Sequence, residues 1–183
     1  MRRSSPTHSK EPVDQARFTA NFDKFYTSAV KPYDPLTRIM PVWRNWLDQT
    51  LPSLRGPCIS EISFGTGYLL TQYAGRFKVY GINYNTAMVA TTRHNLVRKG
   101  LKAALQQADV YHLPYANECI DTIVNTEVFS GYPDGGRALA EMVRVLKPGG
   151  RLVITDINYP HKRNCPGMLM ARFIAITGKS FVM

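Results

Sequence analysis

From Cys58 onward, apolar runs rich in β-branched residues alternate with segments of helical periodicity, and Gly and Pro mark the junctions between them. This alternation is typical of successive βαβ units, which form a parallel sheet. Because crossovers between parallel strands are right-handed, we expect an α/β architecture: an open, doubly wound, mainly parallel sheet of about five strands with helices on both faces. The predicted strands are Cys58–Ser63, Lys78–Asn83, Ala103–Gln107, Thr122–Asn125 and Arg151–Asp156.

Two of the segments between these strands carry apolar residues at spacings of three and four. This periodicity predicts helices at Met88–Lys99 and Gly136–Leu146. The segment Lys147-Pro148-Gly149-Gly150 predicts a turn before the last strand, because Pro cannot continue a helix and Gly accepts a positive φ.

The chain has 183 residues, and 44% of them are apolar, which suffices for one core and favours a single domain. We expect a flexible basic tail at residues 1–12, a helical arm at 13–56 and a core domain at 57–183. The arm is rich in Phe and Trp and is predicted to form two helices separated around Pro32 and Pro35. Its rings either pack into the core, as large apolar side chains usually do, or form a lid over a ligand.

The net charge of +10 is concentrated at the two flanks of the chain. Residues 1–57 contain nine Lys and Arg against five Asp and Glu, and residues 158–183 contain four against none. Short basic pairs such as Lys162-Arg163 have no aromatic residues interleaved and belong to no binding motif. We therefore interpret them as solvated surface and expect no nucleic-acid partner.

The three cysteines, Cys58, Cys119 and Cys165, lie far apart in no metal-ligand spacing, and their odd number favours a reducing compartment over a disulfide framework. No stretch approaches the roughly 20 consecutive apolar residues that span a bilayer. We therefore expect a cytoplasmic protein with no bound metal. A mitochondrial location and a peripheral membrane contact are the alternatives.

The first predicted strand leads into a loop with two glycines, Gly65 and Gly67, at the place where open parallel sheets bind ligands. Glycine lets the backbone turn tightly and approach a ligand, and a following helix offers free N–H groups to an anionic group such as a carboxylate. A dinucleotide-binding loop has a third glycine where this chain has Leu70, so a dinucleotide is disfavoured.

Taken together in order and spacing, four segments within residues 57–157 resemble the class I S-adenosylmethionine-dependent methyltransferases. The first motif of that family runs acid-x-Gly-x-Gly-x-Gly. It matches Glu61, Ser63, Gly65 and Gly67, with Ser in place of the first glycine. The resemblance implies a Rossmann-like fold and S-adenosylmethionine as the cofactor.

The other three segments follow the later strands. Asn83 stands where the family has an acidic residue that holds the ribose, and an amide can both donate and accept there. Asp109 and Val110 match positions that meet the adenine, and residues 135–156 resemble the helix, turn and fifth strand of the family. The cofactor-binding residues that the resemblance implies are Glu61, Ser63, Phe64, Gly65, Gly67, Asn83, Tyr84, Asp109, Val110, Asn125 and Tyr33.

The arm is similar to the lead-in of the ubiquinone/menaquinone-type small-molecule methyltransferases, in which a Tyr-Asp pair, here Tyr33-Asp34, helps to close the cofactor pocket. The expected substrate is a small, apolar or aromatic molecule. Methyl transfer from a sulfonium is an in-line displacement with a good leaving group, so we assign no catalytic base. Candidates near the strand ends, each more often a surface or structural group, are His112, Glu127, Tyr132 and His161.

Related folds continue after the fifth strand with a helix and an antiparallel pair of strands, and we expect this chain to be shortened and to lack that pair. The strand Arg151–Asp156 would then present unpaired N–H and C=O groups, an association hazard. A truncated isoform, a fragment, a homodimer through this edge and a remodelled edge are the alternatives that would account for it. The alternative to a methyltransferase is a truncated or non-catalytic protein of the same fold that binds cofactor weakly and acts as an interaction module.

Overall fold

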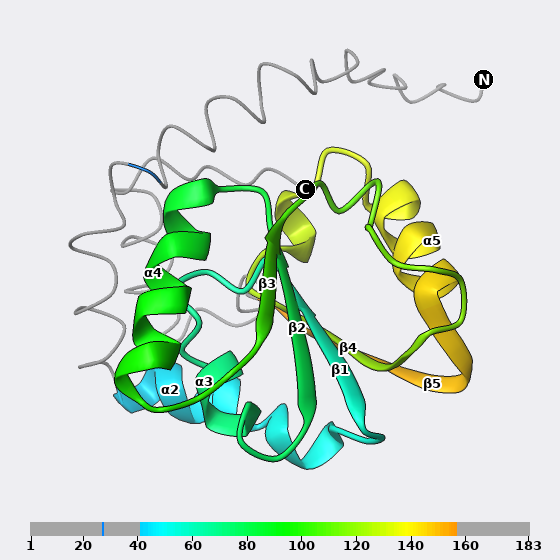
Figure 1. The fold of residues 1–183 in the computed structure, drawn as a ribbon. Helices are drawn as coiled ribbons and strands as arrows, with labels where there is room; N and C mark the ends of the chain where they lie inside the picture. Colours follow the sequence, from blue (N-terminus) through cyan, green and yellow to red (C-terminus); the bar gives the residue numbers. More distant parts are fainter. Residues whose placement is uncertain (1–26, 28–40, 157–183) are drawn as a thin grey trace, which may run out of the picture.

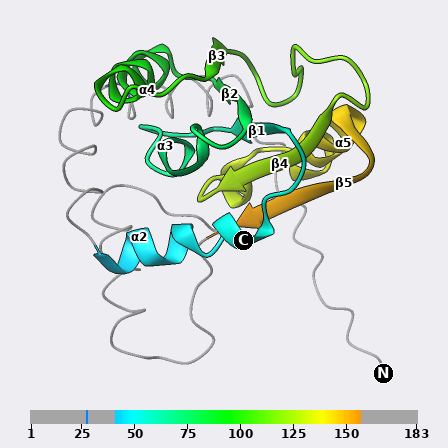
Figure 2. The same ribbon diagram turned by 60° about the horizontal axis from the view of Figure 1, so that its bottom comes forward.

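A computed structural model describes Thr27 and residues 41–156, which form a five-stranded sheet in the order β3–β2–β1–β4–β5. Every pair of neighbouring strands is parallel, so the predicted α/β fold with a doubly wound sheet is confirmed. Figure 2 shows β2 and β3 on one side of β1 and β4 and β5 on the other, so the order in which the strands are added reverses at β1. The strands are β1 (Cys58–Ile62), β2 (Lys78–Asn83), β3 (Ala104–Gln107), β4 (Ile120–Thr126) and β5 (Leu146–Thr155).

Helices cover both faces of this sheet. Figure 1 shows α3 and α4 on one face and α5 on the other, with α2 beside α3. Among the residues that the structure describes, none of the helices has the length and apolarity needed to cross a membrane. The helices are α2 (Pro41–Asp48), α3 (Leu70–Tyr73), α4 (Thr86–Arg98) and α5 (Gly135–Val145), and two short 3-10 helices are η1 (Leu51–Ser53) and η2 (Phe129–Gly131).

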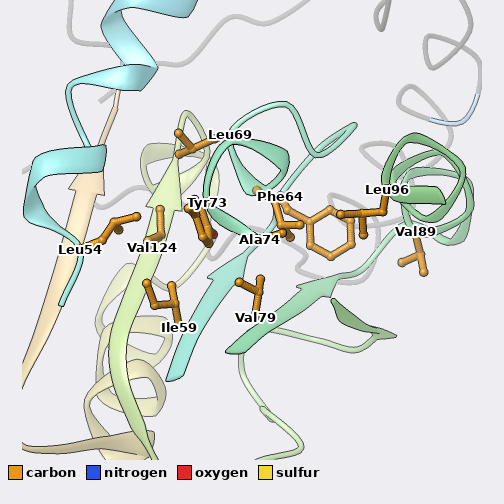
Figure 3. Close-up of a cluster of buried hydrophobic side chains, with 11 residues drawn as sticks. Leu54, Ile59, Phe64, Leu69, Tyr73, Ala74, Val79, Val89, Leu96 and Val124 are labelled. Atoms are coloured by element: carbon orange, nitrogen blue, oxygen red, sulfur yellow. The ribbon is translucent and has the colours of Figure 1, made fainter. Parts of the chain in front are cut away.

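Each face of the sheet has its own hydrophobic core, because successive side chains of a strand point to opposite faces. Ile59 packs in the core under α3 and α4, and Ile62 packs in the core under α5. Both side chains are fully buried, and such burial contributes about 1.5–3 kcal/mol for each side chain of this size. Figure 3 shows the first of these cores, in which the Phe64 ring lies between Ala74 and Leu96.

The two predicted helices begin earlier than their apolar periodicity indicated, because polar caps set their first residues. The Asn85 Oδ1 atom accepts a hydrogen bond of 2.9 Å from the backbone N–H of Met88 at the start of α4. The Asp134 Oδ1 atom accepts one of 2.9 Å from the N–H of Arg137 at the start of α5. Side-chain acceptors at this position satisfy N–H groups that have no partner within the helix.

The prediction that a turn at residues 147–150 precedes the last strand was wrong in its boundary, because β5 already begins at Leu146. Leu146 pairs with Ile120, and the register then shifts so that Arg151 pairs with Thr122. The four residues between form an irregularity within β5. Lys147 is held there by an ion pair with Asp121, with the Lys147 Nζ atom 2.8 Å from the Asp121 Oδ1 atom. Residues 1–26, 28–40 and 157–183, and with them Tyr33, Asp34, His161 and the expected shortened end, lie outside the described residues.

The loop after β1 is held against α4 by a close approach that only glycine permits. Gly67 has a φ of +76°, and a Cβ atom placed on it would lie 2.3 Å from the Cγ2 atom of Thr92. The Thr92 hydroxyl also donates a hydrogen bond of 3.1 Å to the carbonyl of Gly65. The loop and α4 therefore form one packed unit.

We predict that Gly67→Ala destabilises the protein by at least about 1 kcal/mol more than Gly100→Ala does. Gly100 has a similar φ of +66°, but a Cβ atom there meets nothing within 4 Å, so this control carries the backbone cost alone. Urea denaturation of the two variants measures the difference. Adding Thr92→Ser to Gly67→Ala should recover part of the loss, because it removes the clashing methyl group and keeps the hydroxyl. Equal stability of the two alanine variants would contradict the packing argument.

Candidate functional site

A cleft lies at the carboxyl ends of β1, β2 and β4, where the strand order of the sheet reverses. Open α/β sheets bind ligands at this place. The space between its atoms amounts to about 1140 Å³, part of it open to solvent. Described residues that line it include Trp43, Glu61, Ser63, Phe64, Gly65, Thr66, Tyr68, Asn83, Tyr84, Asn85, Met88, Asp109, Val110, Tyr111, Glu127 and Tyr132.

The loop between β1 and α3 forms one wall of the cleft. Ser63 and Gly65 both have a left-handed backbone, with φ values of 61° and 56°. A Cβ atom on Gly65 would meet nothing within 4 Å, so its Cα faces open space in the cleft wall. Ser63 is kept in place by its backbone N–H, which donates a hydrogen bond of 2.6 Å to the carbonyl of Ile82. Backbone and ligand can therefore approach closely at Gly65.

Glu61 is a carboxyl buried beneath this loop. It is 2% exposed, and the Tyr73 hydroxyl of α3 donates a hydrogen bond of 2.6 Å to its Oε2 atom. Burial raises the pKa of Glu61 to about 8, and the hydrogen bond from Tyr73 offsets only part of that rise. Glu61 is therefore largely protonated at neutral pH when no cation is near it.

The described lining of the cleft carries acidic side chains and no basic ones. The described residues that line it include three carboxyl side chains, Glu61, Asp109 and Glu127, and no Lys, Arg or His. Bringing a phosphate into such surroundings would cost free energy, whereas a cationic group would be attracted. The lining thus favours a cationic ligand and disfavours nucleotides that bind through phosphates.

Two polar side chains on the β2 and β3 side are set by turns of the backbone. The Asn83 Oδ1 atom accepts a hydrogen bond of 2.9 Å from the N–H of Asn85. The Asp109 Oδ1 atom accepts one of 3.0 Å from the N–H of Tyr111. Each side chain is therefore held through its Oδ1 atom. The Nδ2 atom of Asn83 and the Oδ2 atom of Asp109 make no hydrogen bond to the described residues.

Residues of the N-terminal arm complete the cleft. The Trp43 indole N–H of α2 donates a hydrogen bond to the Glu127 carboxylate after β4, and the Trp43 ring lies 5.5 Å from the Tyr68 ring. Earlier in the arm, the Thr27 hydroxyl accepts a hydrogen bond of 2.7 Å from the Asn85 amide. Of the two roles considered for the arm, Trp43 therefore takes that of a wall over the cleft.

A hydrogen-bonded chain joins β4 to the loop after β1. Asn125 of β4 is fully buried, and its Nδ2 atom donates to the carbonyl of Ile62 at 3.0 Å and to the hydroxyl of Tyr132 at 2.9 Å. The Tyr132 hydroxyl oxygen lies 2.8 Å from the Ser63 Oγ atom. Burial raises the pKa of Tyr132, so its phenol keeps its proton.

Eight of the eleven residues predicted to bind a cofactor line this cleft, two do not, and the structure does not describe the eleventh. Gly67 packs against Thr92 instead, Asn125 lies buried behind Ser63 and Tyr132, and Tyr33 lies outside the described residues. Of the four candidate bases, Glu127 and Tyr132 line the cleft. His112 is exposed and lies 2.7 Å from the Arg137 guanidinium, and His161 lies outside the described residues.

The sequence did not identify Trp43, Tyr68 and Tyr111 as residues of the site. Trp43 had no motif around it that separates a cleft wall from a core residue. Tyr68 directly follows Gly67 of the first motif, and Tyr111 directly follows Val110. Their closeness to these motif residues was the one signal in the sequence that marked them.

Comparison with known proteins identifies the family. The model of a family described as "Methyltransferase domain" matches residues 60–154, from β1 to β5. This chain belongs to that methyltransferase-domain family. The matched residues contain the loop of Gly65, the ends of β2 and β4 and the whole of α5, so the family match and the cleft coincide.

Curated relatives of this methyltransferase domain have different acceptors in their names. Phosphatidylethanolamine N-methyltransferase of Cereibacter sphaeroides is 35% identical over 104 residues, which cover 56% of this chain and 51% of the relative. The ubiquinone/menaquinone biosynthesis C-methyltransferase UbiE of Idiomarina loihiensis is 30% identical over 149 residues, covering 75% and 59%. The chain thus spans between half and three fifths of the length of these relatives.

Solved structures share the fold of this methyltransferase domain. A SAM-dependent methyltransferase from Aquifex aeolicus superimposes with a TM-score of 0.63 at 19% identity, covering 82% of this chain and 87% of that one. The YcgJ protein of Bacillus subtilis gives a TM-score of 0.61 at 21% identity, covering 65% and 53%. These likenesses confirm the predicted Rossmann-like fold of the class I methyltransferases.

The cleft of this methyltransferase domain fits S-adenosylmethionine on two observations. The open space at Gly65 allows a ligand to contact the backbone where any side chain would intervene. The lining formed by the described residues has carboxyl groups and no basic side chain, which suits a molecule that carries a sulfonium and an ammonium group.

The raised pKa of Glu61 predicts how stability depends on pH. The ordinary pKa of 4.5 applies in the unfolded chain and about 8 in the folded one, so the folded state binds the proton more tightly. The stabilisation is complete below the unfolded pKa and is lost as pH rises through the folded pKa. Glu61→Gln keeps an acceptor for Tyr73 and cannot ionise. Its free energy of unfolding should therefore fall less than that of the wild type between about pH 5 and pH 8.5, by on the order of a few kcal/mol.

Urea unfolding of both proteins across this pH range tests the prediction, since other groups titrate alike in the two and cancel. Parallel pH profiles for the wild type and Glu61→Gln would show that Glu61 ionises normally in the folded protein.

Proposed function

We propose that this protein is an S-adenosylmethionine-dependent methyltransferase that acts on a small, apolar or aromatic molecule. The observation that carries the proposal is the cleft at the strand-order reversal, lined by carboxyl and aromatic side chains and, among the described residues, by no basic side chain. A sulfonium cofactor is the nucleoside ligand whose charge suits this lining, and membership of the methyltransferase-domain family supports the same assignment.

The residues proposed to hold the cofactor lie along the ends of the strands. Glu61 faces the ammonium group, and its ionisation is favoured once that cation is present. Asn83 holds the ribose, and Asp109 with Val110 meets the adenine. When bound, S-adenosylmethionine supplies an electrophilic methyl group on a good leaving group. The protein then contributes alignment of the acceptor and exclusion of water, which alone can supply much of the catalysis.

The proposed acceptor class follows from the rings around the cleft. Trp43, Tyr68, Tyr84 and Tyr111 line it, and the Tyr84 side chain is 44% exposed, so the wall offers apolar area with polar edges. Relatives whose names refer to ubiquinone, menaquinone and phosphatidylethanolamine support an acceptor with a large apolar part. Glu127, bonded to the Trp43 indole N–H, is the cleft carboxylate that would take up a proton from an acidic acceptor.

A second candidate function, a non-catalytic module that binds cofactor weakly, is favoured by two departures from the family motif. Ser63 stands in place of a glycine, and Asn83 stands in place of an acidic residue. Calorimetric titration with S-adenosylmethionine and S-adenosylhomocysteine separates the two functions. Micromolar binding supports the enzyme, and absence of binding by the intact protein favours the module.

The cofactor assignment predicts that Gly65→Val abolishes binding, because a branched side chain would occupy the open space in the cleft wall. Gly100→Val is the matched control, since Gly100 also has a positive φ and open space around its Cα but lies outside the cleft. Both variants should lose similar stability, and only Gly65→Val should lose affinity in calorimetry. Equal affinity of the two variants would remove Gly65 from the site.

Replacing Asn83 by Asp should tighten cofactor binding by about 1 kcal/mol, because an ionised acceptor makes stronger hydrogen bonds to ribose hydroxyls than a neutral amide does. The change keeps the bond from the N–H of Asn85, since a carboxylate has two oxygen atoms. Titration with S-adenosylhomocysteine measures the gain. Unchanged or weaker affinity would show that position 83 does not hold the ribose.

A further inference from the structure

The chain of hydrogen bonds from Asn125 through Tyr132 to Ser63 has a direction. The Asn125 Nδ2 atom can only donate, and its two hydrogens go to the carbonyl of Ile62 and the Tyr132 hydroxyl. The Tyr132 oxygen is therefore an acceptor toward Asn125. Its own proton then has the Ser63 Oγ atom, 2.8 Å away, as its partner among the described residues.

The opposite direction is disfavoured by burial. If Ser63 donated to Tyr132, the phenol proton would be left without a partner among the described residues in an enclosed position. An unsatisfied buried donor costs on the order of a net hydrogen bond or more. Both residues line the cleft, but the phenol is the more enclosed, as burial is the main cause of its raised pKa, so the Ser63 hydroxyl is the group that directs its proton into the cleft.

Two features of the chain carry a cost that packing does not explain. Ser63 has a φ of 61°, a conformation that glycine adopts more readily. The Asn125 Oδ1 atom is the buried side-chain polar atom without a hydrogen-bond partner among the described residues. Strain and unsatisfied groups that persist together are characteristic of sites that serve a ligand. Here both features belong to residues of the same hydrogen-bonded chain.

We propose that the Ser63 hydroxyl, oriented by Tyr132 and Asn125, is a hydrogen-bond donor that the cleft presents to the carboxylate of the bound cofactor. The inference rests on the proposed function. Among the described residues the lining has three carboxyl groups and no Lys, Arg or His, so the donors that it offers a carboxylate are neutral ones. Ser63 is thus a specificity-determining residue, and Tyr132 and Asn125 are positioning residues that act through it.

The test compares two ligands that differ in this carboxylate: S-adenosylmethionine and decarboxylated S-adenosylmethionine. Ser63→Ala should raise the calorimetric Kd for S-adenosylmethionine about tenfold, because a hydrogen bond to a charged group is lost. The Kd for the decarboxylated ligand should change by less than about twofold, since it has no carboxylate to lose. The change in the ratio of the two affinities is the readout.

Ser63→Gly protects the test from a folding artefact. Glycine suits the φ of 61°, so this variant should unfold at the same or a higher urea concentration than the wild type and still show the tenfold loss. A stability gain with an affinity loss separates the role of the hydroxyl from that of the backbone.

Tyr132→Phe tests the direction of the chain. It leaves the Ser63 hydroxyl free to rotate, so it should weaken S-adenosylmethionine binding alone by about threefold and have no further effect when combined with Ser63→Ala. Additive effects of the two changes would overturn the relay.

Equal weakening of both ligands by Ser63→Ala, or weakening of neither, would overturn the proposal and leave the methyltransferase assignment in place. Failure of the wild-type protein to bind either ligand would overturn both the assignment and the inference.

Discussion

The pairing of β1 with β2 on one side and β4 on the other is the constraint on which the rest of the structure depends. It makes β1 the centre of the sheet and brings the ends of three strands together at the point where strand order reverses. Glu61, Ser63 and Asn125 meet there, although up to 64 positions separate them in the sequence. The close contact of Gly67 with Thr92 then holds the loop after β1 against α4. Together with the hydrogen bond from the Ser63 N–H to the carbonyl of Ile82, this contact fixes the wall containing Gly65 relative to the strand ends.

The charge of its described lining distinguishes this cleft from sites that bind nucleotides through their phosphates. Its described lining holds carboxyl groups and rings but no basic side chain, whereas the net charge of the chain is +10. The basic residues that the structure describes lie elsewhere, so the overall charge gives no indication of the charge of this lining. Glu61 is the buried carboxyl of this lining. Burial raises its pKa, so it stays largely protonated at neutral pH as long as no cation lies beside it.

The central strands β1, β2 and β4 were predictable from sequence because parallel strands buried on both faces leave apolar runs, and each of the five predicted strands has its counterpart. Boundaries were less predictable, since caps such as Asn85 and the early pairing of Leu146 depend on hydrogen bonds rather than on periodicity. Most of the motif residues do line the cleft. Trp43 and the links between Ser63, Tyr132 and Asn125 were beyond prediction, because contacts between segments far apart in sequence leave no local pattern.

The strained backbone of Ser63 and the unsatisfied oxygen of Asn125 also bear on how this protein can be engineered. Stabilising substitutions are found most easily where a native residue is suboptimal, and these two positions are among the first that a search for thermostability would select. Glycine at position 63 would relieve backbone strain, and an apolar residue at position 125 would remove the unsatisfied oxygen but leave the carbonyl of Ile62 and the Tyr132 hydroxyl without their donor. Both substitutions would also break the hydrogen-bonded chain from Asn125 through Tyr132 to Ser63. A thermostabilised library should therefore hold residues 63 and 125 constant and look for its gains in the outer turns of α4 and α5.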